Sequence, residues 1–353
     1  MRRDRRPPFE RSGTGSRLCA ALLGGPPRPD GDEVPDGDEV IERPIIALTG
    51  ATGFVGQAVL EAALEAGYAV RALTRRTQPE RRNVDWVGGD LGNRAALADL
   101  MHGVEGVIHV AGVVNAPDAA GFEEGNVTGT LNMIEAAIEA GVRRFVNVSS
   151  LSAREPELSA YGASKAKAEK FLMASPLDWT IVRPPAIYGP HDKEMFELFR
   201  AARWGVMPMP KDGRASMIHV EDLARLLVEL VPGNGEMVGE VADGVSGRVF
   251  EPDDGKPQGW DHYETAMAIG WAMGKRPRVI GMSRGMLTTV ARLDNFLRGT
   301  RAKMTLDRAA YFSHPDWVVS PEATVPATLW QPRIETREGL KATAQWYREQ
   351  KWL

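Results

Sequence analysis

From Pro44 onward, short apolar runs alternate with segments in which apolar residues recur at helical spacing. A short apolar run is typical of a strand buried on both faces, and a period of about 3.6 residues is typical of a helix. Alternating strands and helices build βαβ units. The sequence therefore predicts an α/β fold: a Rossmann-type, doubly wound parallel sheet with helices on both faces. We expect strands at 45–50, 69–73, 84–90, 106–112, 144–150 and 179–185, and helices at 54–66, 93–102, 127–140, 160–174 and 193–203.

The first predicted strand runs into a glycine-rich segment, 49-TGATGFVG-56, that opens the first helix. Gly50, Gly53 and Gly56 allow a tight turn and a close approach of backbone N–H groups to a pyrophosphate, which the helix N-terminus also attracts. A plain glycine-rich turn is the alternative. The position between a strand and a helix favours a dinucleotide phosphate loop.

The end of the second predicted strand, 72-ALTRR-76, indicates which dinucleotide binds. Enzymes that bind NAD usually place an acid here for the ribose 2′-hydroxyl. This chain has Arg75 and Arg76 instead, and a guanidinium suits a 2′-phosphate. A solvated basic pair is the alternative. We expect NADP(H) to be favoured over NAD(H), with Arg75 as the first candidate.

Beyond Tyr188 the alternation loosens into short segments rich in Pro, Gly, Met and Trp. We expect these segments to form a smaller C-terminal substrate lobe over the carboxyl ends of the strands, where ligands bind in open α/β sheets. The predicted division is a disordered tail over 1–43, an NAD(P)-binding domain over 44–190 with a return segment at 216–250, and a substrate-binding lobe from 191–215 and 251–353.

Composition narrows the setting of the chain. The tail is rich in Arg, Pro and Gly and repeats DGDEV, so it has little apolar surface to bury. Its patch 18-LCAALLGG-25 is too short for a convincing signal peptide. A net charge of −4 gives no electrostatic case for nucleic acid, the single Cys19 excludes a disulfide framework, and no apolar run is long enough to span a bilayer. A cytoplasmic protein is the simplest expectation.

An ordered series of further motifs carries a family resemblance. They are Asp90-Leu91, HVAG at 109–112, NVTGT at 126–130, VSS at 148–150, YGASK at 161–165, RPPAIYGP at 183–190 and IHVEDLA at 218–224. From about Ile45 to its end, the chain resembles the extended short-chain dehydrogenases/reductases, a family that includes sugar-nucleotide epimerases and 3β-hydroxysteroid-type dehydrogenases. The resemblance implies an NAD(P)-dependent enzyme.

The resemblance assigns catalysis to Tyr161, Lys165 and Ser150. Taken alone, a Tyr and a Lys four positions apart arise readily on any Lys-rich helix. In the family the tyrosine is the general acid/base, and the ammonium of Lys165 and the cationic nicotinamide are expected to lower its pKa from about 10. Lys165 also bonds the nicotinamide ribose. Ser150 bonds the substrate oxygen, and its neighbour Ser149 is the alternative for that role.

The same resemblance implies the cofactor contacts. Asp90 accepts from the adenine amino group beside Leu91, and Ala111 and Gly112 leave room for the cofactor. Pro184, Pro185 and Ala186 place backbone against the carboxamide, whereas Asn126 ties loops together and His219 is architectural. The histidines show no metal-ligand spacing, so no metal is expected. The expected cofactor-binding residues are Gly50, Thr52, Gly53, Phe54, Val55, Gly56, Arg75, Arg76, Asp90, Leu91, Ala111, Gly112, Lys165, Pro184 and Ala186.

The substrate is less constrained by the sequence. The methionines of 203-RWGVMPMP-210 and the segment 265–274 suggest an apolar pocket lining. Apolar residues at helical spacing in 284–299 indicate core packing or, alternatively, a lid over an apolar substrate in peripheral contact with a membrane. We therefore expect ketone/alcohol interconversion on a steroid-like molecule or a long-chain keto-lipid such as a ketoceramide. The alternatives are a sugar-nucleotide epimerase or dehydratase, with Arg203 or Arg214 for the pyrophosphate, and a non-catalytic NADPH-binding subunit of respiratory complex I. A homodimer is compatible with either enzyme.

Overall fold

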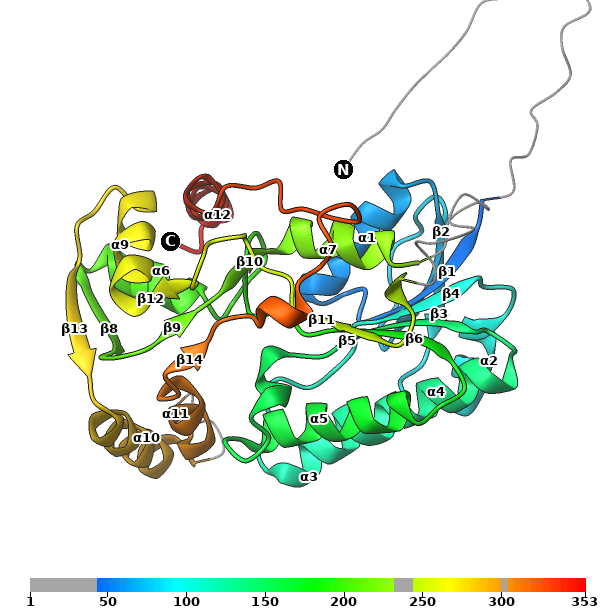
Figure 1. Ribbon diagram of the computed structural model, residues 1–353, viewed down its shortest axis with the longest axis horizontal. Helices are drawn as coiled ribbons and strands as arrows, with labels where there is room; N and C mark the ends of the chain where they lie inside the picture. The colour runs from blue at the N-terminus through cyan, green and yellow to red at the C-terminus, as the bar shows by residue number, and fades with distance from the viewer. Residues whose placement is uncertain (1–42, 232–243, 300–301, 303) are drawn as a thin grey trace, which may run out of the picture. The chain divides into compact units, whose positions relative to one another are not determined.

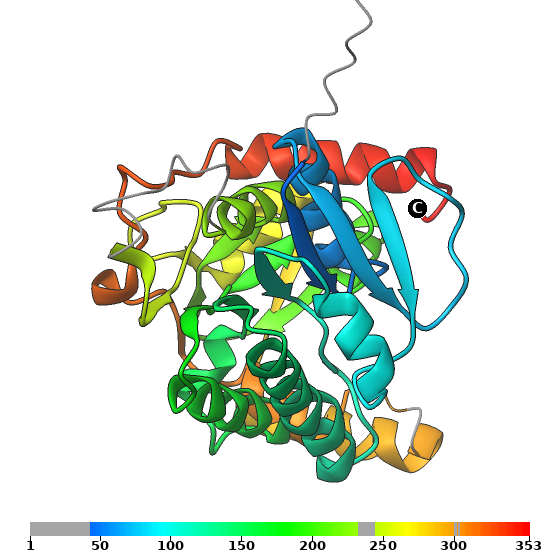
Figure 2. The same ribbon diagram turned by 90° about the vertical axis from the view of Figure 1, so that its right-hand side faces the viewer.

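A seven-stranded parallel sheet forms the centre of the folded unit, in the order β11-β6-β5-β4-β1-β2-β3 (Figures 1 and 2). The computed structural model describes residues 43–231, 244–299, 302 and 304–353. The predicted tail lies outside these residues, except for Arg43. All six predicted strands are confirmed, and the return segment adds a seventh. The strands are β1 (Ile45–Thr49), β2 (Ala69–Thr74), β3 (Val84–Gly88), β4 (Gly106–His109), β5 (Arg144–Val148), β6 (Asp178–Val182) and β11 (Arg248–Phe250).

Helices cover both faces of this sheet, as the alternation predicts (Figure 1). Successive side chains of a strand point to opposite faces. Ile46 and Leu48 of β1 therefore pack against α1 (Phe54–Glu65) and α7 (Val220–Glu229). Ala47, between them, joins the second core under α2 (Arg94–Met101), α4 (Gly129–Glu139) and α5 (Ala160–Met173). The doubly wound fold class is confirmed.

Two helix starts differ from the predicted ones for local reasons. The helix expected from 193 begins only at Phe196 as α6 (Phe196–Arg203), because the Asp192 carboxylate accepts from the backbone N–H groups of Glu194 and Met195 at 2.8 and 2.9 Å and holds a turn there. The helix expected from 127 is preceded by α3 (Ala119–Phe122) and a π-helical segment, η1 (Glu123–Thr128), before α4 begins. The π-helical turn holds Asn126 in the interior.

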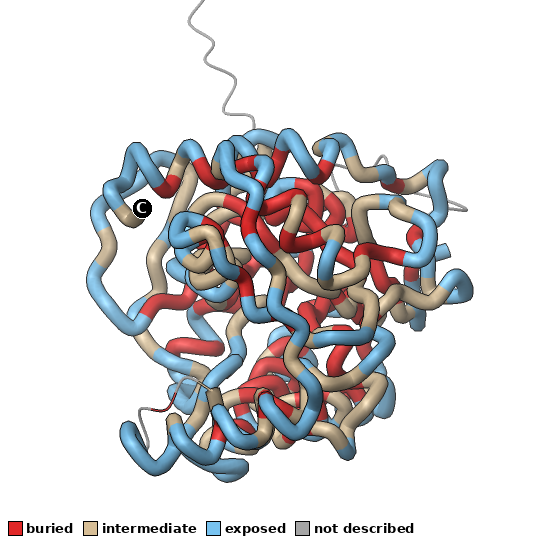
Figure 3. The backbone as a smooth tube through the Cα atoms, turned by 90° about the vertical axis from the view of Figure 1, so that its left-hand side faces the viewer, coloured by how far each residue is buried: buried red, intermediate tan, exposed pale blue. Residues whose placement is uncertain are grey.

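The remaining elements build a smaller lobe beside the sheet (Figure 1). Its core is made by α6, α9, α12 and short strand pairs, and Figure 3 shows buried residues gathered inside the folded unit. Met207 and Met209 are buried in this core, so the expected methionine-rich pocket lining is wrong for both residues. The elements are β7 (Ala186–Tyr188), β8 (Val206–Pro210), β9 (Arg214–Ala215), β10 (Met217–His219), β12 (Trp260–Asp261), α9 (His262–Ala272), β13 (Arg278–Met282), α10 (Arg284–Arg298), α11 (Leu306–Phe312), β14 (Asp316–Trp317), η4 (Pro321–Ala323) and α12 (Thr336–Glu349).

The order of the sheet fixes where a ligand can bind. From β1 the chain continues to β2 and β3 on one side, and after β3 it crosses over to β4 on the other side of β1. The neighbouring strands β1 and β4 therefore form the topological switch point of the sheet. In doubly wound sheets the crevice outside the carboxyl ends of two such strands takes the ligand. Here that position is occupied by the glycine-rich segment after β1 and by residues 110–113 after β4.

Candidate active site

The glycine-rich segment has the geometry of a phosphate-binding loop. Gly50 has a φ of +76°, which L side chains rarely adopt. A Cβ on Gly56 would lie 1.9 Å from the carbonyl oxygen of Gly50, so only glycine lets α1 start this close to β1. Gly53 occupies the N-cap of α1 without a side-chain cap, which leaves N–H groups of the first turn for an anion. Thr52 is exposed beside it, and Phe54 and Val55 are partly buried.

Backbone and small residues close the floor of the crevice. The N–H of Ala111 donates to the Thr49 hydroxyl at 3.1 Å, which joins the ends of β4 and β1. A Cβ on Gly112 would lie 3.1 Å from Nζ of Lys165 and 3.0 Å from Oδ1 of Asn126. A larger residue at position 112 would therefore collide with the side chains of Lys165 and Asn126, which is a second reason for a glycine beside the expected clearance for a cofactor.

Tyr161 and Lys165 lie one turn apart on α5, as their spacing requires. The Ser159 hydroxyl caps this helix by accepting from the N–H of Gly162. Lys165 is 8% exposed, and its Nζ donates to the carbonyl of Val148 at 3.0 Å. Burial lowers the pKa of Lys165 to about 8, while the charge of Glu169 opposes that shift. Lys165 is thus a buried cation held against the end of β5.

Ser150 is the serine that faces Tyr161. Burial raises the pKa of the Tyr161 phenol, and a hydrogen bond with the Ser150 side chain lowers it. The expected lowering by Lys165 is wrong for the chain's own groups, because desolvation outweighs them. Ser150 also accepts from the Ser152 hydroxyl at 2.9 Å. Ser149 instead donates to Oε1 of Glu169 at 2.5 Å, so its hydroxyl proton is engaged by a carboxylate of α5.

A buried ion-pair network supports this side of the site. The Glu169 carboxylate, 2% exposed, accepts from Nε and Nη2 of Arg183 at 2.9 and 2.5 Å. Glu251, from the strand end after β11, lies 3.6 Å from Arg183 and accepts from Arg154 at 3.2 Å. Arg154 in turn donates to the Val318 carbonyl of the lobe. The network therefore links α5 to the ends of β6 and β11 and to the lobe.

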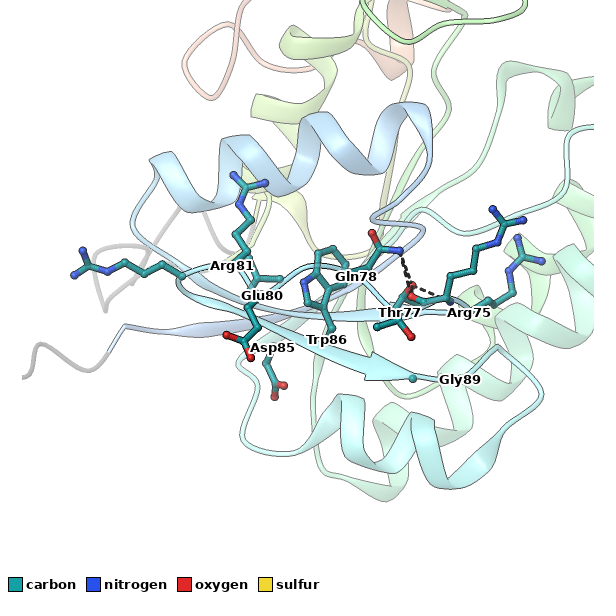
Figure 4. Close-up of a pocket in the computed structure, with 13 residues that line it drawn as sticks. Arg75, Thr77, Gln78, Glu80, Arg81, Asp85, Trp86 and Gly89 are labelled. Carbon is teal, nitrogen blue, oxygen red and sulfur yellow. Dashed lines mark hydrogen bonds between the residues drawn. The ribbon is translucent and has the colours of Figure 1, made fainter. Parts of the chain in front are cut away.

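The predicted adenine-side residues gather at the carboxyl end of β2. Arg75 and Arg76 are exposed and line a cavity of about 990 Å³, which also contacts Thr77, Gln78 and Trp86 (Figure 4). Arg81 lines the same cavity but is paired with Glu61 at 2.7 and 2.5 Å. This cavity lies at the edge of the sheet and is lined neither by Tyr161 nor by the glycine-rich segment, so Arg75 and Arg76 are the expected cofactor residues that it holds.

The other sequence-predicted residues occupy consistent places. Asp90 is exposed and accepts from the Gly92 N–H at 2.9 Å with one oxygen, and Leu91 packs on Gly129. The Pro184 carbonyl accepts from the N–H of Leu151, and Ala186 starts β7. Asn126 bonds both backbone groups of Val113 and the Ser164 hydroxyl, which fits a loop-tying role.

The histidines are structural or solvent-facing. His219 accepts from the N–H of Glu221 at the start of α7 and packs edge-on to Tyr188, and burial lowers its pKa to about 4. His109 lies between the Thr49 and Thr130 hydroxyls, and burial lowers its pKa to about 3. Among the described residues, no three His, Cys, Asp or Glu side chains gather in a way that could hold a metal ion.

Three contributing residues escaped the sequence analysis. Glu169 follows Lys165 by four positions, so helical spacing alone could have suggested its proximity. Asp307 of α11 accepts from the N–H of Ala160 at 2.7 Å and so docks the lobe on the first turn of α5. Tyr311, also on α11, interacts electrostatically with Tyr161 and stacks on Trp317 with a centroid distance of 4.6 Å. No local pattern connects α11 to α5.

Two substrate expectations change with the structure. Arg214 donates to the carbonyls of Gln258 and Gly259 at 2.6 and 3.1 Å, so its guanidinium holds a lobe loop. The sequence suggested that the apolar residues of 284–299 pack in the core. The structure shows this to be wrong for most of them. Only Leu287 and Ala291 of α10 are buried, whereas Phe296 and Leu297 are 86% and 69% exposed.

Comparison with known proteins identifies the family. A model of NAD(P)H-binding proteins matches residues 50–232. A ceramide reductase of Caulobacter vibrioides (strain NA1000 / CB15N) is 38% identical over 320 residues, which cover 88% of this chain and 96% of that protein. The chain belongs to the NAD(P)H-binding extended short-chain dehydrogenases/reductases. It is an NAD(P)-dependent enzyme of this family.

Other members show the range of the family. A UDP-glucose 4-epimerase of Vibrio cholerae is 29% identical over 233 residues, covering 56% of this chain and 70% of that protein. The solved structure of MoeE5 in complex with UDP-glucuronic acid and NAD superposes with a TM-score of 0.64 at 24% identity, over 87% of this chain and 99% of that one. This likeness concerns the fold. None of the helices within the described ranges is both long and apolar enough to cross a membrane.

Proposed function

We propose that the chain is an NADP(H)-dependent reductase that converts a ketone to a secondary alcohol with Tyr161, Lys165 and Ser150. The position of the Ser150 side chain against the Tyr161 phenol, with the buried ammonium of Lys165 one turn along α5, carries this proposal. Nζ of Lys165 approaches Gly112 after β4, and the neighbouring glycine loop, with its uncapped helix start and close-packed glycines, fits a dinucleotide. We also propose that residues 44–190 with 216–250 bind the cofactor, and that the remaining lobe binds the substrate.

The electrostatics of the chain hold Tyr161 in the protonated form that ketone reduction requires. Because burial raises the pKa of Tyr161, the phenol holds its proton near neutral pH. A bound nicotinamide cofactor would supply the hydride to the carbonyl carbon. Tyr161 gives its proton to the carbonyl oxygen, and the Ser150 hydroxyl donates a hydrogen bond to the same oxygen. The Lys165 cation stabilises the phenolate that remains, until solvent returns a proton.

The proposed substrate is a long-chain keto-lipid of the ketoceramide type. The similarity to a ceramide reductase supports this class. Phe122 packs 6.0 Å from the Tyr161 ring, and the Tyr311 ring of the lobe lies on the same site. These rings suit an apolar substrate more than a nucleotide sugar. Arg214 was the better candidate for binding the pyrophosphate of a nucleotide sugar, but its guanidinium is already hydrogen-bonded to backbone carbonyls of the lobe.

Reduction of a ketoceramide in detergent micelles tests the activity through loss of NADPH absorbance. Tyr161→Phe keeps the ring and removes the transferable proton, so kcat should fall by about 10²- to 10⁴-fold. Tyr263→Phe, which makes the same change on an exposed ring of α9, is the matched control and should leave kcat unchanged. Undiminished turnover by Tyr161→Phe would refute the mechanism, and turnover of UDP-sugars alone would refute the substrate class.

The cofactor preference follows from the arginines at the end of β2. Arg75 and Arg76 are exposed in the cavity, whereas Arg81 is engaged by Glu61. A charge-assisted bond is worth about 1.5–3 kcal/mol, so Arg75→Ala should weaken NADPH binding roughly tenfold or more and leave NADH binding nearly unchanged. Arg82→Ala, in the same cavity, is the control. An NADH preference in the unchanged chain, measured by fluorescence titration, would overturn the NADP(H) proposal.

A further inference from the structure

The outer face of α10 is apolar and exposed. Met286, Val290, Leu293 and Leu297 repeat at helical spacing along one stripe and are 48%, 41%, 57% and 69% exposed, and Phe296 beside them is 86% exposed. The adjoining face of the helix is packed, since Leu287 and Ala291 contact Ala309 of α11. Leu306 and Phe312 of α11 are also exposed, at 50% and 39%. We name these seven exposed residues the α10–α11 patch.

The charges on α10 select the partner of the patch. The helix carries Arg284, Arg292 and Arg298 but only one acid, Asp294, which is paired with Arg298 at 3.2 Å. Arg292 precedes Phe296 by one helical turn and is exposed. The whole chain has a net charge of −4, so this cationic helix stands out from the rest. A second copy of the same face would bring arginines against arginines, which disfavours self-association through it.

We propose that the α10–α11 patch docks the protein on the surface of an anionic phospholipid bilayer. An exposed apolar stripe flanked by arginines is the composition of a helix that lies in the membrane interface, with the apolar side chains among the acyl chains and the cations at the headgroups. The patch also connects to the reaction site. Asp307, between the two α11 members of the patch, bonds the N–H of Ala160, the residue before Tyr161.

The test is co-sedimentation of the full chain with two kinds of vesicle. One contains phosphatidylcholine alone, and the other contains phosphatidylcholine with about 30 mol% of the anionic lipid phosphatidylglycerol. Binding should require the anionic lipid and weaken with salt. Loss of one inserted side chain should weaken it at least about tenfold, so Phe296→Ser with Leu293→Ser should abolish it. Arg292→Gln should weaken it severalfold. The control Trp204→Ser removes another exposed ring, 80% exposed at the end of α6, and should bind normally.

Any of the following results would overturn the inference. Absence of binding to anionic vesicles, or binding unaffected by the Phe296 and Leu293 changes, refutes docking through the patch. Equal binding to phosphatidylcholine alone refutes the role of charge. A dimer that these changes dissociate, seen by light scattering without vesicle binding, assigns the patch to a second copy instead. The inference does not depend on the reaction, because vesicle binding without ketoceramide reduction would refute the proposed function alone.

Discussion

Glu169→Gln tests whether the buried network sets the protonation of the reaction site. The substitution keeps the shape of the side chain and one oxygen, which can still accept from Ser149 and from Nε of Arg183. The new amide nitrogen replaces the oxygen that accepts from Nη2 of Arg183 at 2.5 Å, so two donors face each other. Breaking a buried ion pair costs about 3–5 kcal/mol. Because Glu251 still lies 3.6 Å from Arg183, we expect the low end, about 3 kcal/mol, and a melting temperature lower by roughly 5 °C.

The same variant should shift the pH dependence of turnover. Lys165 has a pKa of about 8, and the charge of Glu169 raises it against desolvation. Without that charge the pKa falls, so Lys165 loses its proton at a lower pH. If turnover needs the charged lysine, the decline of kcat on the alkaline side should begin at a lower pH than in the unchanged chain. The measurement is kcat against pH from 6 to 10, a range chosen to span the pKa by about two units on each side.

Glu251→Gln is the matched control for this variant. Glu251 contacts the same Arg183, and also Arg154, but it does not contribute to the pKa of Lys165. It should lower the melting temperature while leaving the pH profile of kcat unchanged. The reasoning fails if both variants show the unchanged profile, or if both shift it equally, because the effect would then not come from the charge of Glu169.

Three further changes probe the loop, the serines and the lobe contact. Gly56→Ala should cost more than about 3 kcal/mol and abolish dinucleotide binding, because its Cβ would lie 1.9 Å from a carbonyl oxygen. Gly285→Ala, whose Cβ would meet only the Ser283 hydroxyl at 3.9 Å, should be tolerated in the same melting and titration assays. Ser150→Ala should lower kcat about 100-fold at an unchanged melting temperature. Ser149→Ala should instead lower the free energy of unfolding by about 1–3 kcal/mol and have a smaller effect on kcat. The reverse result would show that Ser149, and not Ser150, acts in the reaction. Asp307→Asn should cost about 1 kcal/mol and raise the KM for the lipid ketone without changing NADPH affinity, and an unchanged KM would deny the lobe contact a role in substrate binding.

Local sequence patterns were sufficient for the sheet and for the glycine-rich loop after β1. The strands of the sheet are short and mostly apolar, as in IIALT of β1 and GVIH of β4, so each can be recognised without knowing what packs on it. The glycines after β1 are required by backbone geometry at those positions, as the φ of Gly50 and the close approach at Gly56 show. The spacing of Tyr161 and Lys165 follows from helix geometry alone.

Contacts between segments that are distant in the sequence could not be predicted from local patterns. The sequence could not show that Ser149 lies against Glu169 and Ser150 against Tyr161, because Glu169 and Tyr161 come from a different segment, α5. The pKa of Tyr161 was expected to fall, yet burial raises it, and burial depends on elements packed from elsewhere in the chain.

The sequence by itself determined that this chain forms a doubly wound sheet with a dinucleotide loop and a Tyr–Lys pair on one helix. These features depend on residues within a few positions of one another, where backbone geometry decides. Only the tertiary structure decided that Ser150 faces Tyr161, that Arg214 is engaged in the lobe, and that the apolar face of α10 is exposed. Helical spacing shows that one face of α10 is apolar, but whether that face is buried depends on which elements pack against it, and this is fixed only when the lobe folds.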